Sequence, residues 1–369
     1  MYNRRAFFGA LGAFGSALCA PRARGEENWT VTLSAPDGPH PPFVSNSRRL
    51  LSAPELLDAP DEWVDRSLKW IDYILRTYPP GLVELPPRRP ALFRLDEVLH
   101  IESAPRKPLV QAFYRQRLQR AIEEMERTRI SEGMRIWRLY NHGALIRTPS
   151  VSFTVDVVPG PEGMALSGEW LKRLAAQSDV HFISHKHPDH ANPEVARLFV
   201  EAGKPVIAPE RLFPGVTVLE RTPHAEHALA GLRVVAFPGH QGPPVLNNVT
   251  LVRTAEDFTI LHTGDQSGDE GEGGDFDWLA RIGHDRRVDA LLVNGWTNGL
   301  HRMVRGVNPR LVMPGHENEL SHAVPHREEY TQDYERMFGL DYPFIVMAWG
   351  ESFHYAKPAE RLGELPDED

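Results

Sequence analysis

The hydrophobic pattern of the chain changes character near residue 134. Before that point, apolar side chains recur at helical spacing over 61–78 and over 108–128, with a proline-rich stretch between them. After it, short apolar runs bounded by turn residues alternate with amphipathic segments, which is typical of strands that alternate with helices. The sequence therefore predicts a helical extension that packs against an α/β domain over 133–356.

The expected elements of the second part are short and closely spaced. Strands are predicted at 135–141, 144–148, 151–158, 180–184, 205–208, 232–237, 249–253, 259–261, 290–293 and 310–313. Helices are predicted between them at 167–177, 193–202 and 276–281. No repeat of fixed period is visible, and two β-rich halves in series favour a core built from two sheets.

The first 25 residues follow a different pattern. Arg4 and Arg5 precede an apolar run over 7–20 that ends in small residues. A spanning helix needs about 20 apolar residues, so this run is typical of a signal peptide. The arginine pair resembles a twin-arginine export signal. We expect a periplasmic or extracellular protein; the alternative is a cytoplasmic protein with a packed N-terminal segment.

Composition narrows the class of protein. Hydrophobic residues make up 41% of the 369 residues and charged residues 25%, as in a soluble globular protein, and the net charge of −9 disfavours binding to nucleic acid or anionic membranes. The only cysteine, Cys19, lies in the export segment, so a mature chain would have neither disulfides nor thiolate ligands. No later segment is apolar enough to span a membrane. Residues 26–60 form a proline-rich lead-in and 357–369 an acidic tail.

Metal-competent side chains crowd the end of the strand predicted at 180–184. The sequence there is HKHPDH, with three histidines and one aspartate in six residues. Side chains two positions apart on an extended loop can face one ion together, which groups His185 with His187 and turns Asp189 and His190 toward another ion. Because a catalytic metal needs about three protein ligands, further ligands must come from elsewhere in the chain.

Three other predicted strands end in suitable residues. His240 and His316 each follow a strand and a Pro-Gly turn, and Asp265 follows a strand in the motif TGD. Short loops after strands are where a rigid scaffold holds functional groups. With 17 histidines in the chain, chance could explain one such histidine, but the repeated order of strand, Pro-Gly and histidine is more specific.

This ordered set resembles the metallo-β-lactamase superfamily over about residues 134–352. The resemblance implies a four-layer αβ/βα sandwich with an α/β fold. Within the superfamily, the stretches LYNHGALIRTPSVSFTVDVV, ILHTGD and WGESF are most similar to the ascorbate-6-phosphate-lactonase-like hydrolases. An intact Asp265 sets the chain apart from true β-lactamases, which lack a bridging carboxylate.

The resemblance also implies a role for each candidate residue. Asp265 would bridge two metal ions, and Asp156 would hold the histidine loop by hydrogen bonds. The remaining ligands would divide into His185, His187 and His240 for one ion, and Asp189, His190 and His316 for the other. Zinc suits these ligands best, although manganese and iron are also tolerated.

The implied chemistry is hydrolysis by a hydroxide that two ions share, since zinc can lower the pKa of bound water to about 7. Asp189 would accept the proton, and His262 could either hydrogen-bond the substrate or pack in the core. The substrate would be a small ester, lactone or phosphoester, and could be anionic. Two alternatives remain: a phosphodiesterase acting on lipid headgroups or nucleotides, and a non-hydrolytic iron protein. The oligomeric state is open.

The other histidines are less informative. His224 and His227 are expected in a surface turn, and His301, with Arg302 and Arg305, on a solvated helix rather than at a substrate site.

Overall fold

A computed structural model describes residues 59–242, 245–266 and 275–357. The predicted export segment, most of the lead-in and the tail beyond Lys357 lie outside these residues, as does Cys19. Among the helices that the structure describes, none combines the length and the apolar character that crossing a membrane requires.

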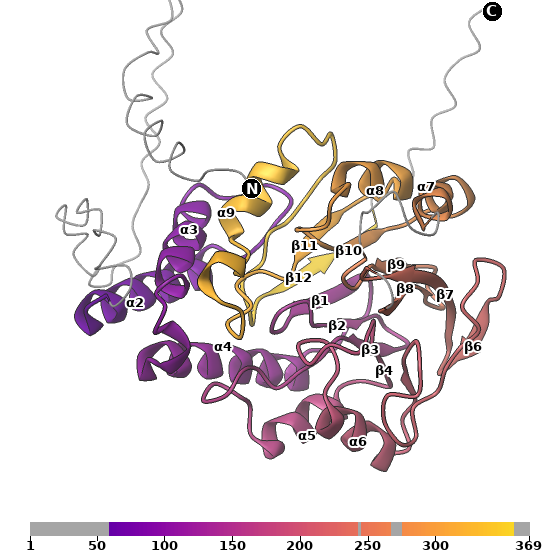
Figure 1. Ribbon diagram of the computed structural model, residues 1–369, viewed down its shortest axis with the longest axis horizontal. Helices are drawn as coiled ribbons and strands as arrows, with labels where there is room; N and C mark the ends of the chain where they lie inside the picture. The colour runs from indigo at the N-terminus through magenta and orange to yellow at the C-terminus, as the bar shows by residue number, and fades with distance from the viewer. Residues whose placement is uncertain (1–58, 243–244, 267–274, 358–369) are drawn as a thin grey trace, which may run out of the picture. The chain divides into compact units, whose positions relative to one another are not determined.

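Two mixed six-stranded sheets form the centre of the described chain (Figure 1). The first has the strand order β12-β1-β2-β3-β4-β5, and its strands are β1 (Met134–Arg138), β2 (Ala144–Arg147), β3 (Ser152–Val155), β4 (Val180–Phe182), β5 (Val206–Ile207) and β12 (Ser352–Tyr355). The second has the order β11-β10-β9-β8-β7-β6, and its strands are β6 (His227–Leu229), β7 (Leu232–His240), β8 (Leu246–Arg253), β9 (Thr259–His262), β10 (Ala290–Asn294) and β11 (Val312–Gly315).

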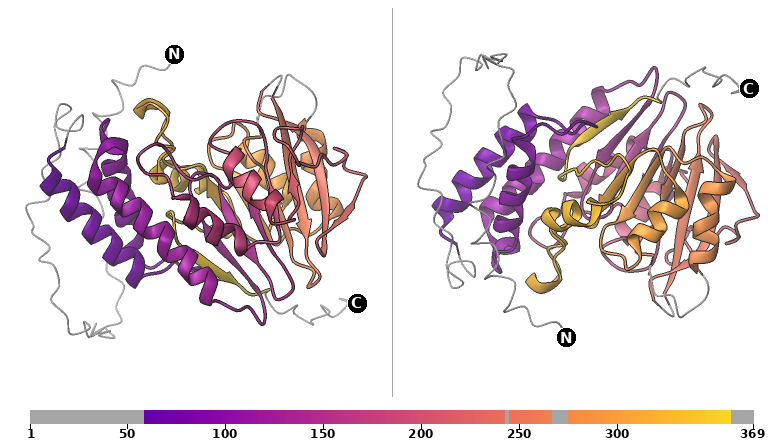
Figure 2. Two further views of the ribbon diagram at one scale, coloured as in Figure 1. Left: turned by 90° about the horizontal axis from the view of Figure 1, so that it is seen from below. Right: turned by 90° about the horizontal axis from the view of Figure 1, so that it is seen from above.

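Three apolar clusters define four layers. The middle cluster draws on both sheets, with Phe153 and Phe182 from the first and Val234 and Leu292 from the second. The outer face of the first sheet packs against helices α4 (Pro108–Arg127), α5 (Gly168–Ala176) and α6 (Pro193–Glu201). The outer face of the second sheet packs against α7 (Asp275–Asp285) and α8 (Leu300–Val307) (Figures 1 and 2). The predicted αβ/βα sandwich is confirmed.

The helical extension belongs to the outer layer of the first sheet. Helices α2 (Asp61–Thr77) and α4 fall close to the predicted ranges, and Val64, Ile71, Tyr114 and Ile122 share one buried cluster with Trp137 of β1. Amphipathic helices bury their apolar stripe in this way, and most of their stability comes from that packing. The extension therefore completes the main domain's helical layer.

A helix that the sequence pattern missed joins α2 to α4. The prolines over 79–90 are expected to interrupt the helical pattern, but α3 (Arg88–Leu99) begins within that stretch. Pro87 stands at the N-cap and Pro90 in the first turn, where the missing N–H costs no helical hydrogen bond. A further unpredicted helix, α9 (Tyr330–Met337), contacts α3.

A buried ion pair ties the extension to the WGESF motif. The Arg88 guanidinium donates to both carboxylate oxygens of Glu351, at 2.7 and 2.6 Å. Both side chains are almost fully buried, and Glu351 also accepts a hydrogen bond from the backbone N–H of Ala348. A bidentate pair of this kind fixes geometry as well as charge. This motif therefore anchors α3 beside the first sheet.

Candidate metal centre

The ends of several strands meet at one edge of the two sheets. In the first sheet β3 runs parallel to β4, so Asp156 and the histidine loop follow adjacent strand ends. In the second sheet β9, β10 and β11 are parallel, so the residues after His262, Asn294 and Gly315 follow neighbouring ends. Because parallel strands present their carboxyl ends at one edge, chemically active side chains from distant segments converge there.

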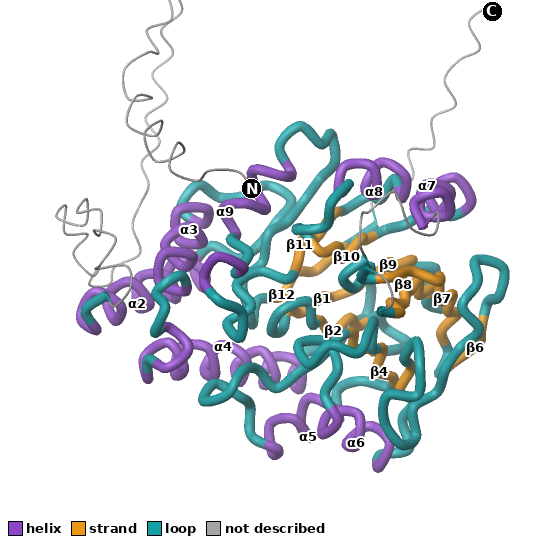
Figure 3. Tube along the Cα trace, in the orientation of Figure 1, coloured by secondary structure: helices purple, strands orange, loops and turns teal. Residues whose placement is uncertain are grey.

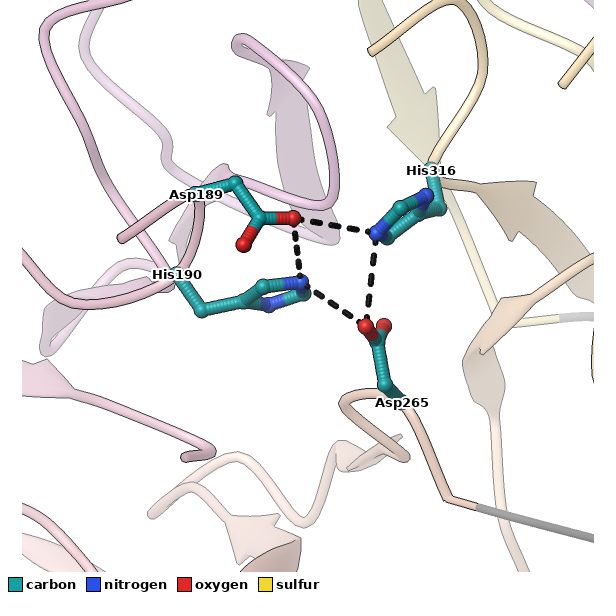
Figure 4. A group of neighbouring side chains, drawn as sticks. All are labelled: Asp189, His190, Asp265 and His316. Carbon is teal, nitrogen blue, oxygen red and sulfur yellow. Dashed lines mark hydrogen bonds and ion pairs between the residues drawn. The ribbon is translucent and has the colours of Figure 1, made fainter. Parts of the chain in front are cut away.

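Four of the predicted ligands form a compact cluster: Asp189, His190, Asp265 and His316 (Figure 4). The Nε2 atom of His190 lies 3.2 Å from Oδ2 of both aspartates. Nε2 of His316 lies 3.2 Å from Asp189 Oδ2 and 3.3 Å from Asp265 Oδ2. Two imidazoles and two carboxylates thus point their ligand atoms at a common centre.

His185 extends this cluster. Its Nε2 atom lies 3.8 Å from Asp265 Oδ2, and it is buried without a hydrogen-bond partner among the described residues. The opposite ring nitrogen, Nδ1, lies 3.0 Å from the Ser184 hydroxyl. A fully buried nitrogen without a partner is costly, and a positive ion near Asp265 would supply the partner it lacks.

The three central histidines are oriented in the same way. Each Nε2 faces the cluster, while each Nδ1 is held from behind. Asp156 Oδ2 lies 2.7 Å from Nδ1 of His190, and Glu328 Oε2 lies 2.9 Å from Nδ1 of His316. Metal-ligating histidines in proteins characteristically have such a partner on the second nitrogen, which fixes the ring and its tautomer. This orientation fits a bound divalent ion.

The other two predicted ligands lie beside the cluster. The ring of His187 is 4.7 Å from the ring of His185. His240 ends β7, and its backbone N–H donates to the side chain of Gln266, the neighbour of Asp265. Neither belongs to the described groups of ligand atoms that lie within 4.8 Å of one another. The structure therefore brings four of the predicted ligands tightly together and places the others beside them.

Asp156 lies behind the histidine loop, as the resemblance implies. Its carboxylate accepts hydrogen bonds of 2.6 Å from both the backbone N–H and the hydroxyl of Ser184, besides contacting His190. The residue is fully buried. Burial alone would raise the pKa of Asp156, but the nearby His190 outweighs it and brings the pKa to about 2. Asp156 therefore stays ionised and clamps the loop.

Charges within the cluster balance each other. Burial alone would lower the pKa of His190 and His316, yet the carboxylates around them, Asp265 first, raise both values well above the usual range. The same contacts outweigh the effect of burial on Asp265 and Asp189 and hold their pKa values below the usual range. Without an ion, these contacts therefore favour protonated His190 and His316 beside ionised Asp189 and Asp265.

Metal binding should consequently release protons. A ligating imidazole must be neutral, so an ion has to displace the protons on His190 and His316. We expect about two protons to leave per chain at pH 7, and the affinity for metal to fall as the pH is lowered. Calorimetric titration of zinc in two buffers of different ionisation enthalpy measures this number. Equal heats in both buffers would contradict the charge state described above.

Glu328 was not found by sequence reasoning. It lies in a long loop between β11 and α9 that is mostly irregular (Figure 3), twelve residues after the histidine it contacts. Nothing in the sequence HREEY distinguishes it from its neighbour Glu329, which instead lies 3.4 Å from His100 of the extension. Only the path of the loop brings Glu328 to the back of His316.

The Glu328→Gln variant should bind metal more weakly. The amide keeps the size of the side chain but loses the charge that orients His316, and such losses cost about 10–100-fold in metal affinity. Competition with a chromogenic chelator measures the affinity. Glu329→Gln is the matched control, since it changes charge by the same amount one residue away. Equal affinities in the two variants would mean that Glu328 does not support the ligand.

His142 is a second residue that the sequence pattern did not reveal. It is fully buried, neither of its ring nitrogens has a hydrogen-bond partner among the described residues, and Nδ1 lies 4.0 Å from Asp265 Oδ1. Burial and the neighbouring His262 lower its pKa well below the usual value. The residue follows the first predicted strand, so the rule applied to the other strand ends could have identified it.

His262 is almost fully buried against His142, with ring centroids 4.2 Å apart. Its Nδ1 accepts a hydrogen bond from the backbone N–H of Gly264, and its Nε2 lies 3.4 Å from the carbonyl oxygen of His142. Both nitrogens therefore face the backbone. These contacts support the turn that carries Asp265 and favour the packing alternative for this histidine; its catalytic role stays a prediction.

The helical extension holds the loop that carries His316. Asp96 of α3 accepts hydrogen bonds from the Asn318 side chain at 2.9 Å and from the backbone N–H groups of Tyr330 and Thr331. Arg327 donates back to the carbonyl oxygen of Leu99 at 2.7 Å. Removing these contacts would free both ends of the loop, so the extension positions the centre from behind.

A close approach of backbone and side chains fixes the residue before His316. A Cβ atom on Gly315 would come within 2.6 Å of the ring of His142 and still nearer to the guanidinium of Arg138. Arg138 in turn donates to Glu317 at 2.7 Å inside the protein. Glycine is needed at this position because no side chain would fit.

Unusual backbone conformations gather around the cluster. Asn141, Asp156, His316 and Asn318 all have positive φ values, between 44° and 80°. Non-glycine residues rarely adopt this region, and such strain in proteins concentrates at functional sites. Asn141 also donates to Asp189 Oδ2 at 3.0 Å. The loops are thus held in the shape that brings the ligands together.

Comparisons with known proteins find distant structural likenesses alone. No family profile and no curated protein sequence matches the chain. Among solved structures, it is similar to a metallo hydrolase, Igni18, from Ignicoccus hospitalis, with 16% identity and a TM-score of 0.49 over 60% of this chain and 99% of that one. It is also similar to the metallo-β-lactamase fold protein YhfI of Bacillus subtilis, with 14% identity and a TM-score of 0.43. That likeness covers 61% of this chain and 100% of YhfI. A third similar structure is that of CmlA, a diiron β-hydroxylase from Streptomyces venezuelae, with 14% identity and a TM-score of 0.44. That likeness covers 61% of this chain and 54% of CmlA. These likenesses assign no activity to the chain.

Proposed function

We propose that the chain is a metal-dependent hydrolase of the metallo-β-lactamase superfamily with a dinuclear centre. The observation that supports this most directly is the position of Asp265 Oδ2, which lies within 3.2–3.8 Å of the Nε2 atoms of three histidines. One carboxylate oxygen facing three imidazoles from both halves of the chain is suited to a bridge between ions. Zinc is the metal that these ligands favour, with manganese or iron as alternatives.

The residues divide the chemistry among them. Bound divalent ions would supply an activated water and an electrophilic centre for negative charge that develops on the substrate. Asp189 is the most exposed member of the four-residue cluster, with 15% of its side chain accessible, against 6% or less for the others. It is therefore the carboxylate best placed to accept a proton from the attacking water. Asn141 donates a hydrogen bond to Oδ2 of that carboxylate and so helps to fix its orientation.

The proposed substrates are small esters, lactones or phosphoesters, in line with the resemblance to ascorbate-6-phosphate-lactonase-like hydrolases. The same centre would suit phosphodiesters of lipid headgroups or nucleotides. A non-hydrolytic iron protein is the alternative from another class, because the ligands also suit iron.

A substrate panel tests the proposal. The purified chain is loaded in turn with zinc, manganese and iron, and assayed on a generic ester, a lactone and an aryl phosphodiester. We expect hydrolysis of at least one substrate that a chelator abolishes and added metal restores. Oxygen consumption by the iron form, without hydrolysis by any form, would favour the redox alternative and contradict the proposal.

We also propose export through the twin-arginine route, on the strength of Arg4 and Arg5 and the apolar run that follows them. This route would carry the protein already folded with its metal. Changing both arginines to lysine should leave a fusion of the segment with a reporter in the cytoplasm. Cell fractionation measures the distribution. Equal export of both fusions would make ordinary secretion the better description.

A further inference from the structure

A cavity lies at the opposite end of the second sheet from the metal cluster. Its volume is about 720 Å³, within the range of small-molecule sites. Arg253 at the end of β8, Thr259 at the start of β9 and Arg310 just before β11 line it. The metal cluster follows the other ends of β9 and β11, so the strands separate the two sites. We call this cavity the distal cleft.

The distal cleft is rich in positive charge, although the chain as a whole carries a net charge of −9. Among the described residues that line it, three are acidic: Asp257, Asp285 and Asp289. Six are cationic: Arg253, Arg281, Arg286, Arg287, Arg310 and Lys357. A cleft lined mainly by one sign of charge concentrates its field and attracts ligands of the opposite sign.

The acidic residues of the lining lie only at ion-pair distance from three of these cations. Asp289 lies 3.7 Å from Arg310 and 3.6 Å from Lys357, and Asp257 lies 3.9 Å from Arg253. All three separations exceed hydrogen-bond length, whereas Arg286 donates to Glu226 at 3.4 Å and Lys357 donates to the carbonyl oxygen of Asp257 at 2.5 Å. Asp289 is occupied instead by the backbone N–H of Thr259, at 2.9 Å. Buried Nε of Arg310 has no hydrogen-bond partner among the described residues.

One wall of the distal cleft is apolar. Phe237 and Trp278 stack face to face, with centroids 5.1 Å apart and planes 6° from parallel, and Leu251 and Ile282 adjoin them. Trp278 is only half-buried. A ligand that satisfies both walls needs an anionic group for the arginines and a flat apolar part for the aromatic side.

We propose that the distal cleft binds a small organic phosphate that carries an aromatic or other flat apolar group. Phosphate oxygens would take the hydrogen bonds that the carboxylates are too distant to accept, with the arginines as donors. The ring would lie along Trp278. This site does not depend on the metal centre, so its ligand need not be the substrate.

Phenylphosphonate is a suitable probe because its carbon–phosphorus bond resists hydrolysis. Calorimetry on the full, metal-loaded chain should detect its binding, and Arg310→Gln should weaken it by about tenfold or more, as expected for the loss of a charged hydrogen bond. Arg310 is largely buried, so Arg287→Gln, at an exposed position, provides a second variant that should weaken binding without a risk to folding. Ester hydrolysis should be unchanged in both.

Arg305→Gln is the matched control. Arg305 is an exposed arginine on α8 that does not line the distal cleft, so its loss changes the net charge equally and should leave binding intact. Methylphosphonate, which lacks the ring, should bind more weakly than phenylphosphonate, and Trp278→Leu should remove that difference. If Arg310→Gln and Arg287→Gln bind the probe as tightly as Arg305→Gln does, the probe lies at the metals instead, and the proposal is overturned. If a chain shortened after Lys357 binds the probe and the full chain does not, the cleft would be assigned to the acidic segment 358–369. That result would also overturn the proposal.

Discussion

Replacing Asp265 with asparagine is expected to remove at least one metal ion from each chain and to lower hydrolysis by about 100-fold or more. The amide has nearly the shape of the carboxylate but lacks its charge, which neutral imidazoles cannot replace. It also brings a donor where only acceptors fit, because Asn294 donates to Oδ1 at 2.8 Å and Gln241 to Oδ2 at 3.0 Å. One of these amides would face another N–H group in the variant.

Metal content per chain and the rate on a generic ester measure the effect of this substitution. His224→Ala is the control, since His224 is exposed and lies in the segment before β6, remote from the cluster in the sheet order. Two tightly held ions in Asp265→Asn, or loss of metal in His224→Ala, would show that the wrong ligands have been chosen from a histidine-rich chain.

The Asp156→Asn variant is expected to lose both activity and stability. Three donors converge on this buried carboxylate, two from Ser184 and one from His190. Removing one partner of a buried charged pair typically costs about 3–5 kcal/mol. Asparagine tolerates the positive φ of 44° at this position, so the backbone conformation contributes little to the loss. Chemical denaturation of the metal-free protein measures the change in the free energy of unfolding.

The pH dependence of stability follows from the same residue. Folding lowers the pKa of Asp156 to about 2, so its ionised carboxylate contributes to the free energy of unfolding at neutral pH. This contribution is lost as the pH falls from about 4 to about 2. That contribution is roughly 2 kcal/mol, and Asp156→Asn should lack this acid transition. Asp257→Asn is the control: it also has a positive φ, of 65°, but its side chain is 76% exposed. A similar loss of stability in both variants would indicate a backbone effect.

The sequence predicted the order of strands and helices because their hydrophobic patterns are local. It also singled out the residues of the cluster, because each follows a predicted strand, and the resemblance implied how they group. Asp189, His190, Asp265 and His316 do so although they are up to 127 positions apart. Local patterns were sufficient for these four residues because the strands that precede them end at the same edge.

Residues that support the cluster could not be found in this way. Glu328 and Asp96 act through a long loop and through a helix of the extension, and neither follows a strand. Their partners are set by how the loop packs against α3, which no periodicity records. Helix α3 itself was missed because prolines usually interrupt helices, whereas those of its first turn lie where helices accept them.

Anomalous diffraction from crystals of the metal-loaded protein, recorded at the absorption edge of the bound metal, tests the dinuclear centre most directly. Two peaks are expected per chain on either side of Asp265, one beside Asp189, His190 and His316 and the other beside His185, His187 and His240. A single peak, or a peak among His142, Asp156 and His262, which also lie close enough together to hold an ion, would contradict the dinuclear centre.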